Sequence, residues 1–444
     1  MRSYHSLVLI AFLVFTVSSA EASNSAGRCI VCHKEVTPGL YQQWEGSAHA
    51  LNNVSCLSCH QAKKGESDAF QHQGEWIATL VTPNDCGQCH ANESSEFTSS
   101  HHAKAGQILE SNDAYLAHVV GGAPAAIAGC ESCHGGKMIV DPNSPNKLSF
   151  KTWPNSGIGR INPDGSLGAC NSCHSRHNFS RSQARQPETC GKCHLGPDHP
   201  QKEIYEESKH GIAYYTNIDK MNLDSPRWIV GEDYNAAPTC ATCHLSATKN
   251  QPITHDAGKR ISWTLRPEIS VPTENSVQKR KNMQNVCAAC HGSVWVDGHY
   301  YQFDGLVNLY NDKFAKPAKE IMGILKKNKS LKNPAEFSNN VEWTYWELWH
   351  HEGRRARHGA AMMGPDYTWW HGIYEVGKHF YFKFLPEVRE TGDAEAIGYI
   401  DNMLTKEPMH QWMQQPTPDI KKNLRNGSQQ GIYEKFFPAK GKRK

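Results

Sequence analysis

Residues 287–291 read CAACH, and residues 240–244 read CATCH. The same five-residue frame, in which two cysteines are separated by two residues and followed directly by a histidine, recurs along most of the chain. It occupies residues 29–33, 56–60, 86–90, 130–134, 170–174, 190–194, 240–244 and 287–291. These eight copies contain all 16 cysteines of the 444-residue chain, so an explanation of this motif accounts for every cysteine.

The CxxCH frame is the attachment signature of c-type haem. Its two thiols bond to one edge of a porphyrin, and its histidine then reaches the iron as the proximal ligand. Structural zinc sites instead combine paired CxxC units with histidines several residues away. The sequence therefore predicts eight covalently bound haems. The attachment residues are Cys29, Cys32, Cys56, Cys59, Cys86, Cys89, Cys130, Cys133, Cys170, Cys173, Cys190, Cys193, Cys240, Cys243, Cys287 and Cys290, and the proximal ligands are His33, His60, His90, His134, His174, His194, His244 and His291.

A haem that only transfers electrons commonly has a second, distal histidine ligand. Histidines other than the motif residues and His5 are available for this role: His49, His72, His101, His102, His118, His177, His199, His210, His255, His299, His350, His351, His358, His371, His379 and His410. Small or turn-forming neighbours let a ring approach a porphyrin, as in SAHA at residues 47–50 and SKHG at residues 208–211. The candidate distal ligands are His49, His102, His118, His177, His210, His255 and His371.

The N-terminus predicts export. Arg2 precedes an apolar run over residues 7–17, and AEA at residues 20–22 offers small residues for cleavage. The alternative is a membrane anchor, but the run is too short to span a bilayer and the chain becomes polar at Glu21. We expect a cleaved signal peptide, residues 1–22, and a periplasmic protein, which agrees with haem attachment outside the cytoplasm.

Two regions are expected in the mature chain. Over residues 23–299 the motif spacing has no fixed period, which argues against a solenoid, and frequent Gly, Pro and Asn predict short helices and loops around the haems. Residues 300–444 contain no cysteine and carry long helical patterns. The expected fold is mainly α: an octahaem c-type cytochrome with a haem-packed N-terminal region followed by long C-terminal helices.

The helical patterns in the C-terminal region have recognisable starts and stops. Asn333-Pro334 resembles a helix start, Gly364-Pro365 breaks this helix and opens a second one to about residue 390, and a third covers residues 393–405. One face of the first helix carries Trp343, Trp346 and Trp349. These rings are expected to pack between helices, with coverage of a haem edge or a subunit interface as alternatives.

Catalysis requires an iron with an open position and nearby acid–base groups, which a chain of fully ligated haems lacks. The run GPDHP at residues 196–200 places Asp198 and His199 together on a turn directly after the sixth motif. Such a pair can move protons. The alternative is an axial histidine beside a turn-capping aspartate.

Four longer stretches carry a resemblance to a known family. They read NPDGSLGACNSCHSRHNFS (162–180), CGKCHLGPDHPQKEIYEESKHG (190–211), PTCATCHLSATKNQPITHDAGKRISWTLRP (238–267) and HHEGRRARHGAAMMGPDYTWWHGIYEV (350–376). Along essentially the whole mature chain, the sequence resembles the octahaem hydroxylamine oxidoreductase (hydroxylamine dehydrogenase) family. The resemblance implies a homotrimer with seven bis-histidine haems and a catalytic fourth haem whose distal face is open. Here that haem is bound by Cys130, Cys133 and His134.

The resemblance also implies catalytic residues. In the oxidising members a tyrosine of a neighbouring subunit is bonded covalently to the catalytic haem. The best match here is Tyr367 in GPDYTWWHG, with Tyr374 as the second choice. Asp198 and His199 match the distal pair of the family, and Tyr234 matches a further tyrosine of the pocket.

The implied reaction is oxidation of hydroxylamine to nitric oxide or nitrite, with electrons passing to a cytochrome c or a quinone-linked cytochrome. Related scaffolds suggest reduction of nitrite or hydroxylamine towards ammonia, or oxidation of hydrazine, as alternatives. A different class is a non-catalytic electron conduit in which histidines close all eight irons. Uptake of cyanide or nitric oxide distinguishes an open haem from such a conduit. No run interleaves basic and aromatic residues in the manner of single-stranded nucleic-acid binding, so no nucleic-acid partner is expected.

Overall fold

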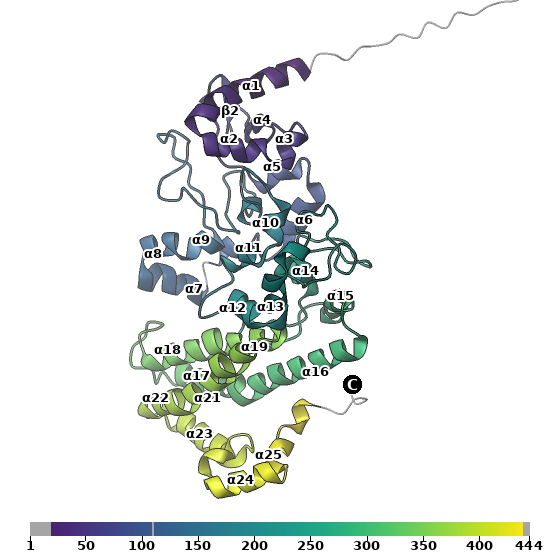
Figure 1. Ribbon diagram of the computed structural model, residues 1–444. Coiled ribbons are helices and arrows are strands. Elements are labelled where there is room, and N and C mark those ends of the chain that lie inside the picture. Colours follow the sequence, from purple (N-terminus) through teal and green to yellow (C-terminus); the bar gives the residue numbers. More distant parts are fainter. Residues whose placement is uncertain (1–18, 109–110, 438–444) are drawn as a thin grey trace, which may run out of the picture. The chain divides into compact units, whose positions relative to one another are not determined.

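The computed structural model describes residues 19–108 and 111–437 (Figure 1). The predicted signal peptide lies outside the described residues, except that its last four residues begin the first helix. In the described part of the chain, helices dominate and the only paired strands form one hairpin, so the mainly α expectation is confirmed. No helix within the described ranges is both long and apolar enough to cross a membrane.

The chain divides into two compact units. Unit 1 comprises Met1–Thr98 with His102–Ser180, and unit 2 comprises Ser99–His101 with Arg181–Lys444. The first five CxxCH motifs therefore belong to unit 1 and the last three to unit 2. The boundary between the two units reflects how the chain packs, and it lies within residues 23–299. The boundary expected at residue 300 reflects a different property, the end of the cysteine-containing part of the sequence.

Apart from the long first helix, unit 1 consists of short helices, loops and one hairpin. The helix of the second motif begins with a local cap, in which the Ser55 hydroxyl accepts a hydrogen bond from the backbone N–H of Ser58. The helices are α1 (Ser19–Val36), α2 (Pro38–Glu45), α3 (Ala48–Leu51), α4 (Cys56–His60), α5 (Pro83–Gly87), α6 (Ala91–Ser99), η1 (Ala105–Gln107), α7 (Asn112–Tyr115), η2 (Leu116–Gly121), α8 (Ala123–Ala128), α9 (Cys130–His134) and η3 (Cys170–Ser172).

The hairpin in unit 1 joins β1 (Phe70–His72) to β2 (Glu75–Ile77). The strands are antiparallel, with Phe70 opposite Ile77 and His72 opposite Glu75. The two connecting residues, Gln73 and Gly74, have φ values of 50° and 88°. Positive φ at both positions is typical of the tight type I′ turn, which fixes the register of the hairpin and so the position of His72.

Unit 2 contains short helices around the last three motifs and longer helices after them. The elements are α10 (Arg181–Arg185), α11 (Pro187–Gly191), α12 (Gln201–Glu207), α13 (Lys209–Thr216), η4 (Ile218–Lys220), α14 (Cys240–His244), η5 (Ala257–Arg260), α15 (Ser276–Cys287), α16 (Ser293–Tyr310), η6 (Asn311–Ala315), α17 (Lys316–Lys327), α18 (Asn340–Trp346), η7 (Glu347–Glu352), α19 (Gly353–Met362), α20 (Pro365–Thr368), η8 (Trp369–Tyr374), α21 (Glu375–His379), η9 (Phe380–Phe384), α22 (Leu385–Glu390), α23 (Ala394–Lys406), η10 (Gln411–Gln414), α24 (Thr417–Arg425), α25 (Ser428–Gly431) and η11 (Glu434–Phe436).

The longer helices of unit 2 run through π-helical turns. The turn η6 joins α16 to α17, η7 joins α18 to α19, and η8 and η9 join α20, α21 and α22. A π turn adds a residue to the helical repeat and so changes which side chains face the neighbouring helices.

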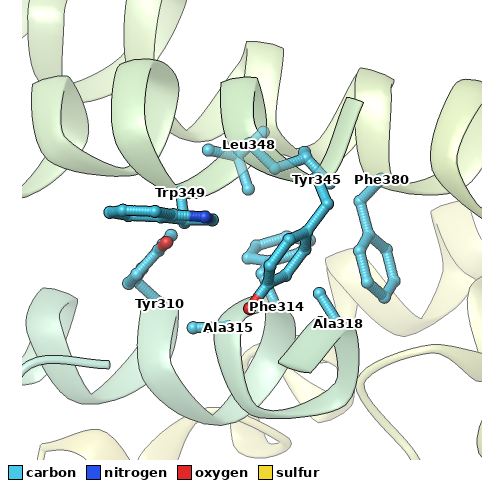
Figure 2. Close-up of a pocket in the computed structure, with 9 residues that line it drawn as sticks. Tyr310, Phe314, Ala315, Ala318, Tyr345, Leu348, Trp349 and Phe380 are labelled. Atoms are coloured by element: carbon cyan, nitrogen blue, oxygen red, sulfur yellow. The ribbon is translucent and has the colours of Figure 1, made fainter. Parts of the chain in front are cut away.

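Aromatic and aliphatic side chains from these helices form the main core of unit 2 (Figure 2). Tyr310, Phe314 and Phe380 are each at most 4% exposed, and Tyr345 and Trp349 close the cluster from the α18–η7 side. The space left among them is about 10 Å³, which is enough for at most one water molecule. This core therefore stabilises the fold and offers no room for a ligand.

The predicted C-terminal helices are confirmed in two of three cases. The second covers α20 to α22 and ends at Glu390, and the third is α23, capped by Asp393. The predicted start at Asn333 is wrong, because α18 begins at Asn340 with a capping box formed by Asn339 and Glu342. The side chain of Asn339 also hydrogen-bonds the backbone carbonyl of Asn333, so the preceding residues form a loop.

In the tryptophan stripe Trp346 is buried, whereas Trp343 and Trp349 are half-buried. Trp346 is 4% exposed, its ring is 4.8 Å from that of Trp349, and Phe337 packs against both Trp343 and Trp346. The stripe thus contributes to packing around α18.

Candidate functional site: the haem-attachment motifs

Motif histidines face second histidines at a nearly constant separation. The ring centroids are 6.2 Å apart for His33 and His72, 6.3 Å for His60 and His177, 6.2 Å for His90 and His49, 6.0 Å for His194 and His199, and 6.1 Å for His291 and His210. The first three pairs lie in unit 1 and the last two in unit 2.

This separation is the one that a shared iron requires. A metal–nitrogen bond to imidazole is about 2 Å long, so two such bonds, with about 1 Å from each nitrogen to its ring centre, separate the centroids by about 6 Å. The adjacent cysteines are free of disulfides and available for thioether bonds. The residues of the first, second, third, sixth and eighth motifs therefore fit a c-type haem with two axial histidines.

Three predicted distal candidates, His49, His177 and His210, lie in these pairs. Sequence reasoning did not select His72, and its position depends on the hairpin turn described above. His371 is exposed and forms ion pairs with Asp366 at 3.5 Å and Glu375 at 3.3 Å. For His102 and His255, both half-buried, and for His118, exposed on η2, the ligand role stays a prediction.

The second ring nitrogen of several proximal ligands has a hydrogen-bond partner. Nδ1 of His60 lies 2.9 Å from the carbonyl oxygen of Ala78, and Nδ1 of His244 lies 3.3 Å from that of Ala257. Such a bond holds the proton on Nδ1 and leaves Nε2 to bind the metal. The rings are thus oriented for coordination by the chain itself.

Cysteines of different motifs lie next to one another within each unit. The thiol groups of Cys86 and Cys170 are hydrogen-bonded, and so are those of Cys190 and Cys240. The third motif therefore adjoins the fifth, and the sixth adjoins the seventh.

Further cysteines of different motifs lie within electrostatic range of one another, and these pairs extend both series of motifs. They join the first motif to the second through Cys29 and Cys56, and the second to the third through Cys59 and Cys86. In unit 2 they join the seventh to the eighth. The neighbour order is thus one, two, three, five in unit 1 and six, seven, eight in unit 2.

The fourth motif is held by close backbone contacts at glycines. The backbone N–H of Gly159 donates to the His134 carbonyl at 3.0 Å. A Cβ at Gly159 would lie 2.4 Å from the backbone nitrogen of Gly106, and one at Gly157 would lie 2.1 Å from that of Gly135. Gly135 itself has a φ of 81°, which disfavours other residues. Backbone rather than bulky side chains therefore surrounds this part of the motif.

The predicted acid–base pair lies beside the sixth motif, in unit 2. Asp198 is 3.6 Å from Nδ1 of His199 and 3.4 Å from a guanidinium nitrogen of Arg354 on α19. Because the His199 ring faces His194 at 6.0 Å, the geometry favours the alternative in which His199 is an axial ligand beside an aspartate. The role of this pair at the fourth haem stays a prediction.

Tyr234 lies against the seventh motif. It is 5% exposed, its hydroxyl is 2.6 Å from that of Thr242 inside the CATCH sequence, and its ring stacks on Trp228 at 4.5 Å. Burial raises the pKa of Tyr234 above its usual value, so the hydroxyl stays protonated. This tyrosine thus supports the haem-attachment helix α14.

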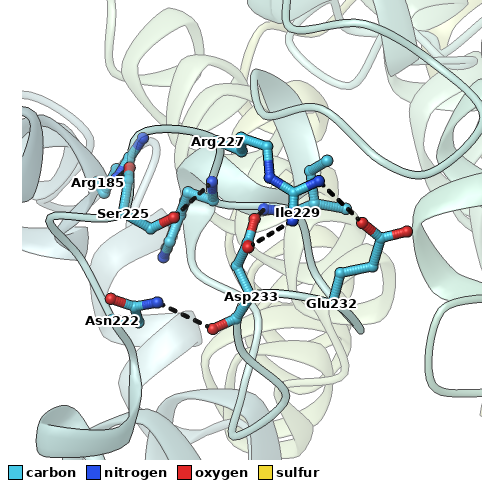
Figure 3. Close-up of polar contacts among 8 residues, drawn as sticks. Arg185, Asn222, Ser225, Arg227, Ile229, Glu232 and Asp233 are labelled. Atoms are coloured by element: carbon cyan, nitrogen blue, oxygen red, sulfur yellow. Dashed lines mark hydrogen bonds and ion pairs between the residues drawn. The ribbon is translucent and has the colours of Figure 1, made fainter.

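A polar loop holds Trp228 and Tyr234 in place (Figure 3). Asp233 accepts hydrogen bonds from the backbone N–H of Ile229 at 2.8 Å and from Arg227 at 2.9 Å. These bonds, led by that from Ile229, lower the pKa of Asp233. Arg185 donates to the Ser225 carbonyl at 2.7 Å and lies over the Trp228 ring.

The two candidate crosslinking tyrosines lie at α20 and η8. Tyr367 is half-buried, and its backbone N–H donates to Glu207 at 3.3 Å. Burial raises the pKa of Tyr367. Tyr374 is 46% exposed and packs against the exposed Trp370 at 5.3 Å. Both side chains belong to a partly exposed aromatic segment.

Comparisons with known proteins point to multihaem cytochromes. Residues 164–333 match the family model described as "Seven times multi-haem cytochrome CxxCH". A solved structure described as a hypothetical multiheme protein is 25% identical, with a TM-score of 0.71, and the match covers 88% of this chain and all of that one. A reducing HAO-like protein complex of Kuenenia stuttgartiensis has the same fold, with a TM-score of 0.62 at 20% identity over 86% of this chain and 87% of that one.

The sequence is also 23% identical to a probable nitrite reductase–hydroxylamine oxidoreductase fusion protein of Kuenenia stuttgartiensis, over 78% of this chain. The chain spans about half, 49%, of the length of that relative. Motifs, fold and comparisons together define a mainly helical multihaem c-type cytochrome, a class that carries out redox electron transfer. More particularly, the chain is similar in sequence to that fusion protein and shares its fold with the HAO-like complex.

Proposed function

We propose that this protein is a periplasmic octahaem oxidoreductase that oxidises hydroxylamine to nitric oxide or nitrite at the fourth haem. The observation that carries the electron-transfer part is the set of histidine pairs at 6.0–6.3 Å. The catalytic part is supported by the resemblance in four long stretches and by the names of the relatives.

The chain's own residues have distinct tasks in this proposal. Each c-type haem supplies an iron that takes up and releases one electron. The paired histidines hold each site in a fixed coordination, which keeps the structural change on electron transfer small. The cysteines of neighbouring motifs lie near one another, so the fold places successive sites close together, in the order one, two, three, five and the order six, seven, eight.

Oxidation of hydroxylamine releases protons together with electrons, so carboxylates and imidazoles near the substrate are needed to accept them. The resemblance offers Asp198 and His199 for this role, but His199 faces His194 at 6.0 Å in the manner of an axial ligand, so Asp198 is the remaining candidate. Tyr367 of a neighbouring subunit in a homotrimer is the candidate for a covalent bond to the catalytic haem. The electrons would pass to a cytochrome c or a quinone-linked cytochrome.

A second candidate is the reverse direction, reduction of nitrite or hydroxylamine towards ammonia. The observation that favours it is the similarity to a structure titled as a reducing HAO-like complex. One experiment separates the two: the purified holoprotein is given hydroxylamine with an artificial electron acceptor, and separately nitrite or hydroxylamine with a reduced viologen. Faster turnover in the first assay supports oxidation, and turnover in the second alone supports reduction.

A ligand-binding experiment tests whether the protein is an enzyme or an electron conduit. The oxidised and reduced holoprotein is titrated with cyanide and nitric oxide while the haem absorption is followed. One ligand bound per chain is expected for a single open haem. Absence of binding, together with absence of turnover in both assays, would establish an electron conduit instead.

The crosslink is tested on a haem-stained denaturing gel of protein boiled with reductant. A haem-staining trimer that becomes a monomer in Tyr367→Phe, but not in Tyr374→Phe, would support the proposed crosslink and the oxidising branch. Monomers in every lane would remove the crosslink and favour the reductive branch.

A further inference from the structure

The histidine of the sixth motif, His194, differs from His60 and His244 in the group that lies next to its Nδ1. Nδ1 of His194 lies 3.3 Å from Oε1 of Gln201, the first residue of α12. For His60 and His244 the corresponding partner is a backbone carbonyl, which cannot rotate. A side-chain amide can rotate and exchange its oxygen for its nitrogen. Something else must therefore hold the amide of Gln201 in the productive orientation.

His358 on α19 occupies that place. Its Nε2 lies 3.4 Å from Nε2 of Gln201, and the residue is only 8% exposed. Burial, followed by the charges of Arg357, Arg266 and Arg354, lowers the pKa of His358 well below its usual value. The ring is therefore neutral, with one nitrogen that accepts a hydrogen bond and one that donates.

The proton positions follow in sequence from the coordination of His194. When Nε2 of His194 binds a metal, its Nδ1 carries a proton and needs an acceptor, which must be Oε1 of Gln201. The amide nitrogen of Gln201 then points to His358, which must accept through Nε2 and carry its own proton on Nδ1. That Nδ1 is buried without a hydrogen-bond partner among the described residues. A buried donor without a hydrogen bond lowers the stability of the fold. The position of His358 is therefore better explained by the hydrogen bond that its Nε2 accepts from Gln201 than by a contribution to folding.

We propose that Gln201 and His358 are positioning residues that set the reduction potential of the iron bound by His194. The inference rests on the proposed function in one respect, namely that the sixth motif binds a bis-histidine haem. A hydrogen bond accepted from Nδ1–H increases the electron density that the imidazole donates, which stabilises the oxidised iron and lowers its potential. Helix α19 thereby acts on the sixth site through α12 without touching the haem ligand.

The test is a potentiometric titration of the whole holoprotein, followed by absorption and electron paramagnetic resonance. Gln201→Leu removes the acceptor, and Gln201→Glu provides a stronger one. His358→Leu removes the group that orients Gln201, and His358→Gln restores an acceptor oxygen. Gln411→Leu is the matched control, because Gln411 donates to the Thr405 carbonyl at 2.8 Å far along the chain from any motif.

Gln201→Leu is expected to favour reduction of one haem about tenfold, a rise of about 59 mV for one electron, while the other transitions stay in place. Gln201→Glu should shift the same transition in the opposite direction. His358→Leu should shift it in the direction of Gln201→Leu, and His358→Gln should return it towards the original potential. Gln411→Leu should leave every transition unchanged.

Unchanged potentials in both Gln201 variants, with full haem content, would overturn the inference even if the His358 variants failed to fold. Failure of the underlying proposal looks different. In that case the original protein would lack a low-spin haem attached to the peptide that contains Cys190 and Cys193.

Discussion

Histidines determine the character of this protein at the scale of single residues. The same side chain is expected to serve as a proximal ligand in the motifs and as a distal partner in His72 or His177, and burial keeps it neutral in His358 and His410. What separates these roles is the partner of each ring nitrogen, because a nitrogen engaged with a carbonyl or hydroxyl leaves only the other one for a metal.

Removal of one distal histidine should leave one haem iron with a vacant coordination position. In His177→Ala the site of the second motif loses the ring that lies 6.3 Å from His60, so one additional haem per chain should become high-spin and bind cyanide. Optical titration with cyanide and electron paramagnetic resonance measure this change. His371→Ala is the control, and a similar gain of cyanide binding there would show that the distance criterion fails.

His410 should make stability depend on acidity. Burial, followed by the charge of Lys313, lowers the pKa of His410 from 6.5 to about 4, and its Nδ1 lies 2.8 Å from the Tyr381 hydroxyl. As the pH falls, the unfolded chain binds a proton at this histidine at a higher pH than the folded chain does. The stabilisation that neutral His410 gives the folded state is therefore complete above pH 6.5 and is lost between pH 6.5 and about 4.

The loss should amount to about 2–3 kcal/mol in the free energy of unfolding, measured by denaturant titration at several pH values. His410→Gln should be less stable near neutral pH but should show less of this dependence. If the two proteins lose the same stability between pH 6.5 and 4, His410 does not titrate as inferred.

Local sequence signals explain many boundaries at the scale of elements. Pro365 opens α20, and Asp393 caps α23, and both follow from residue types whose effect reaches only a few positions. The start of α18 was predicted wrongly at Asn333, because two Asn residues close together, Asn333 and Asn339, both suit a helix start. The capping box with Glu342 decides in favour of Asn339.

Loss of the α23 cap should lower stability. The Asp393 carboxylate accepts hydrogen bonds from the backbone N–H of Ala396 and from Asn328, so Asp393→Ala should cost about 1–2 kcal/mol. Thermal unfolding measures the change. Asp419→Ala, in the exposed first turn of α24, should have an effect below about 0.5 kcal/mol. Equal losses in both variants would contradict a specific capping role.

The backbone contacts at the fourth motif should tolerate no side chain. In Gly159→Ala the new Cβ would meet the backbone of Gly106, so residues 157–161 must move away from the motif. We expect a loss of about 3 kcal/mol or more, with incomplete haem attachment at Cys130 and Cys133, measured by peptide mass spectrometry. Gly39→Ala, with open space around its Cβ, should attach haem normally. Normal attachment in both variants would show that this contact is dispensable.

Bound porphyrin rather than aliphatic packing is expected to complete the interior of most of the molecule. The largest aliphatic and aromatic core lies in the long helices of unit 2, which follow the last motif. Around the motifs the clusters are smaller, as in that of Leu80, Met138 and Leu148. We therefore expect folding of this chain to depend on its cofactors, in the way that small metal-binding domains do.

The haem count is the prediction at this scale. The intact mass of the purified protein should exceed that of the chain by eight haems, and denaturation should release none of them, because every attachment is a thioether. Variants with serine in place of both cysteines of one motif should lose one haem each. A wild-type mass with fewer than eight haems would contradict the assignment of every CxxCH frame.

The sequence by itself was sufficient to predict eight attachment frames, a helical fold and the helices after residue 364, because each depends on residues a few positions apart. Only the tertiary structure decided which histidine faces which motif. His72 reaches His33 through a hairpin, and His177 reaches His60 across more than a hundred residues. Asp198 and His199 are adjacent in sequence, yet only packing against α19 shows that one pairs with Arg354 while the other faces His194. Apart from His194 and His199, which are five residues apart, the facing histidines belong to chain segments that meet only after folding, and no local pattern records such a meeting.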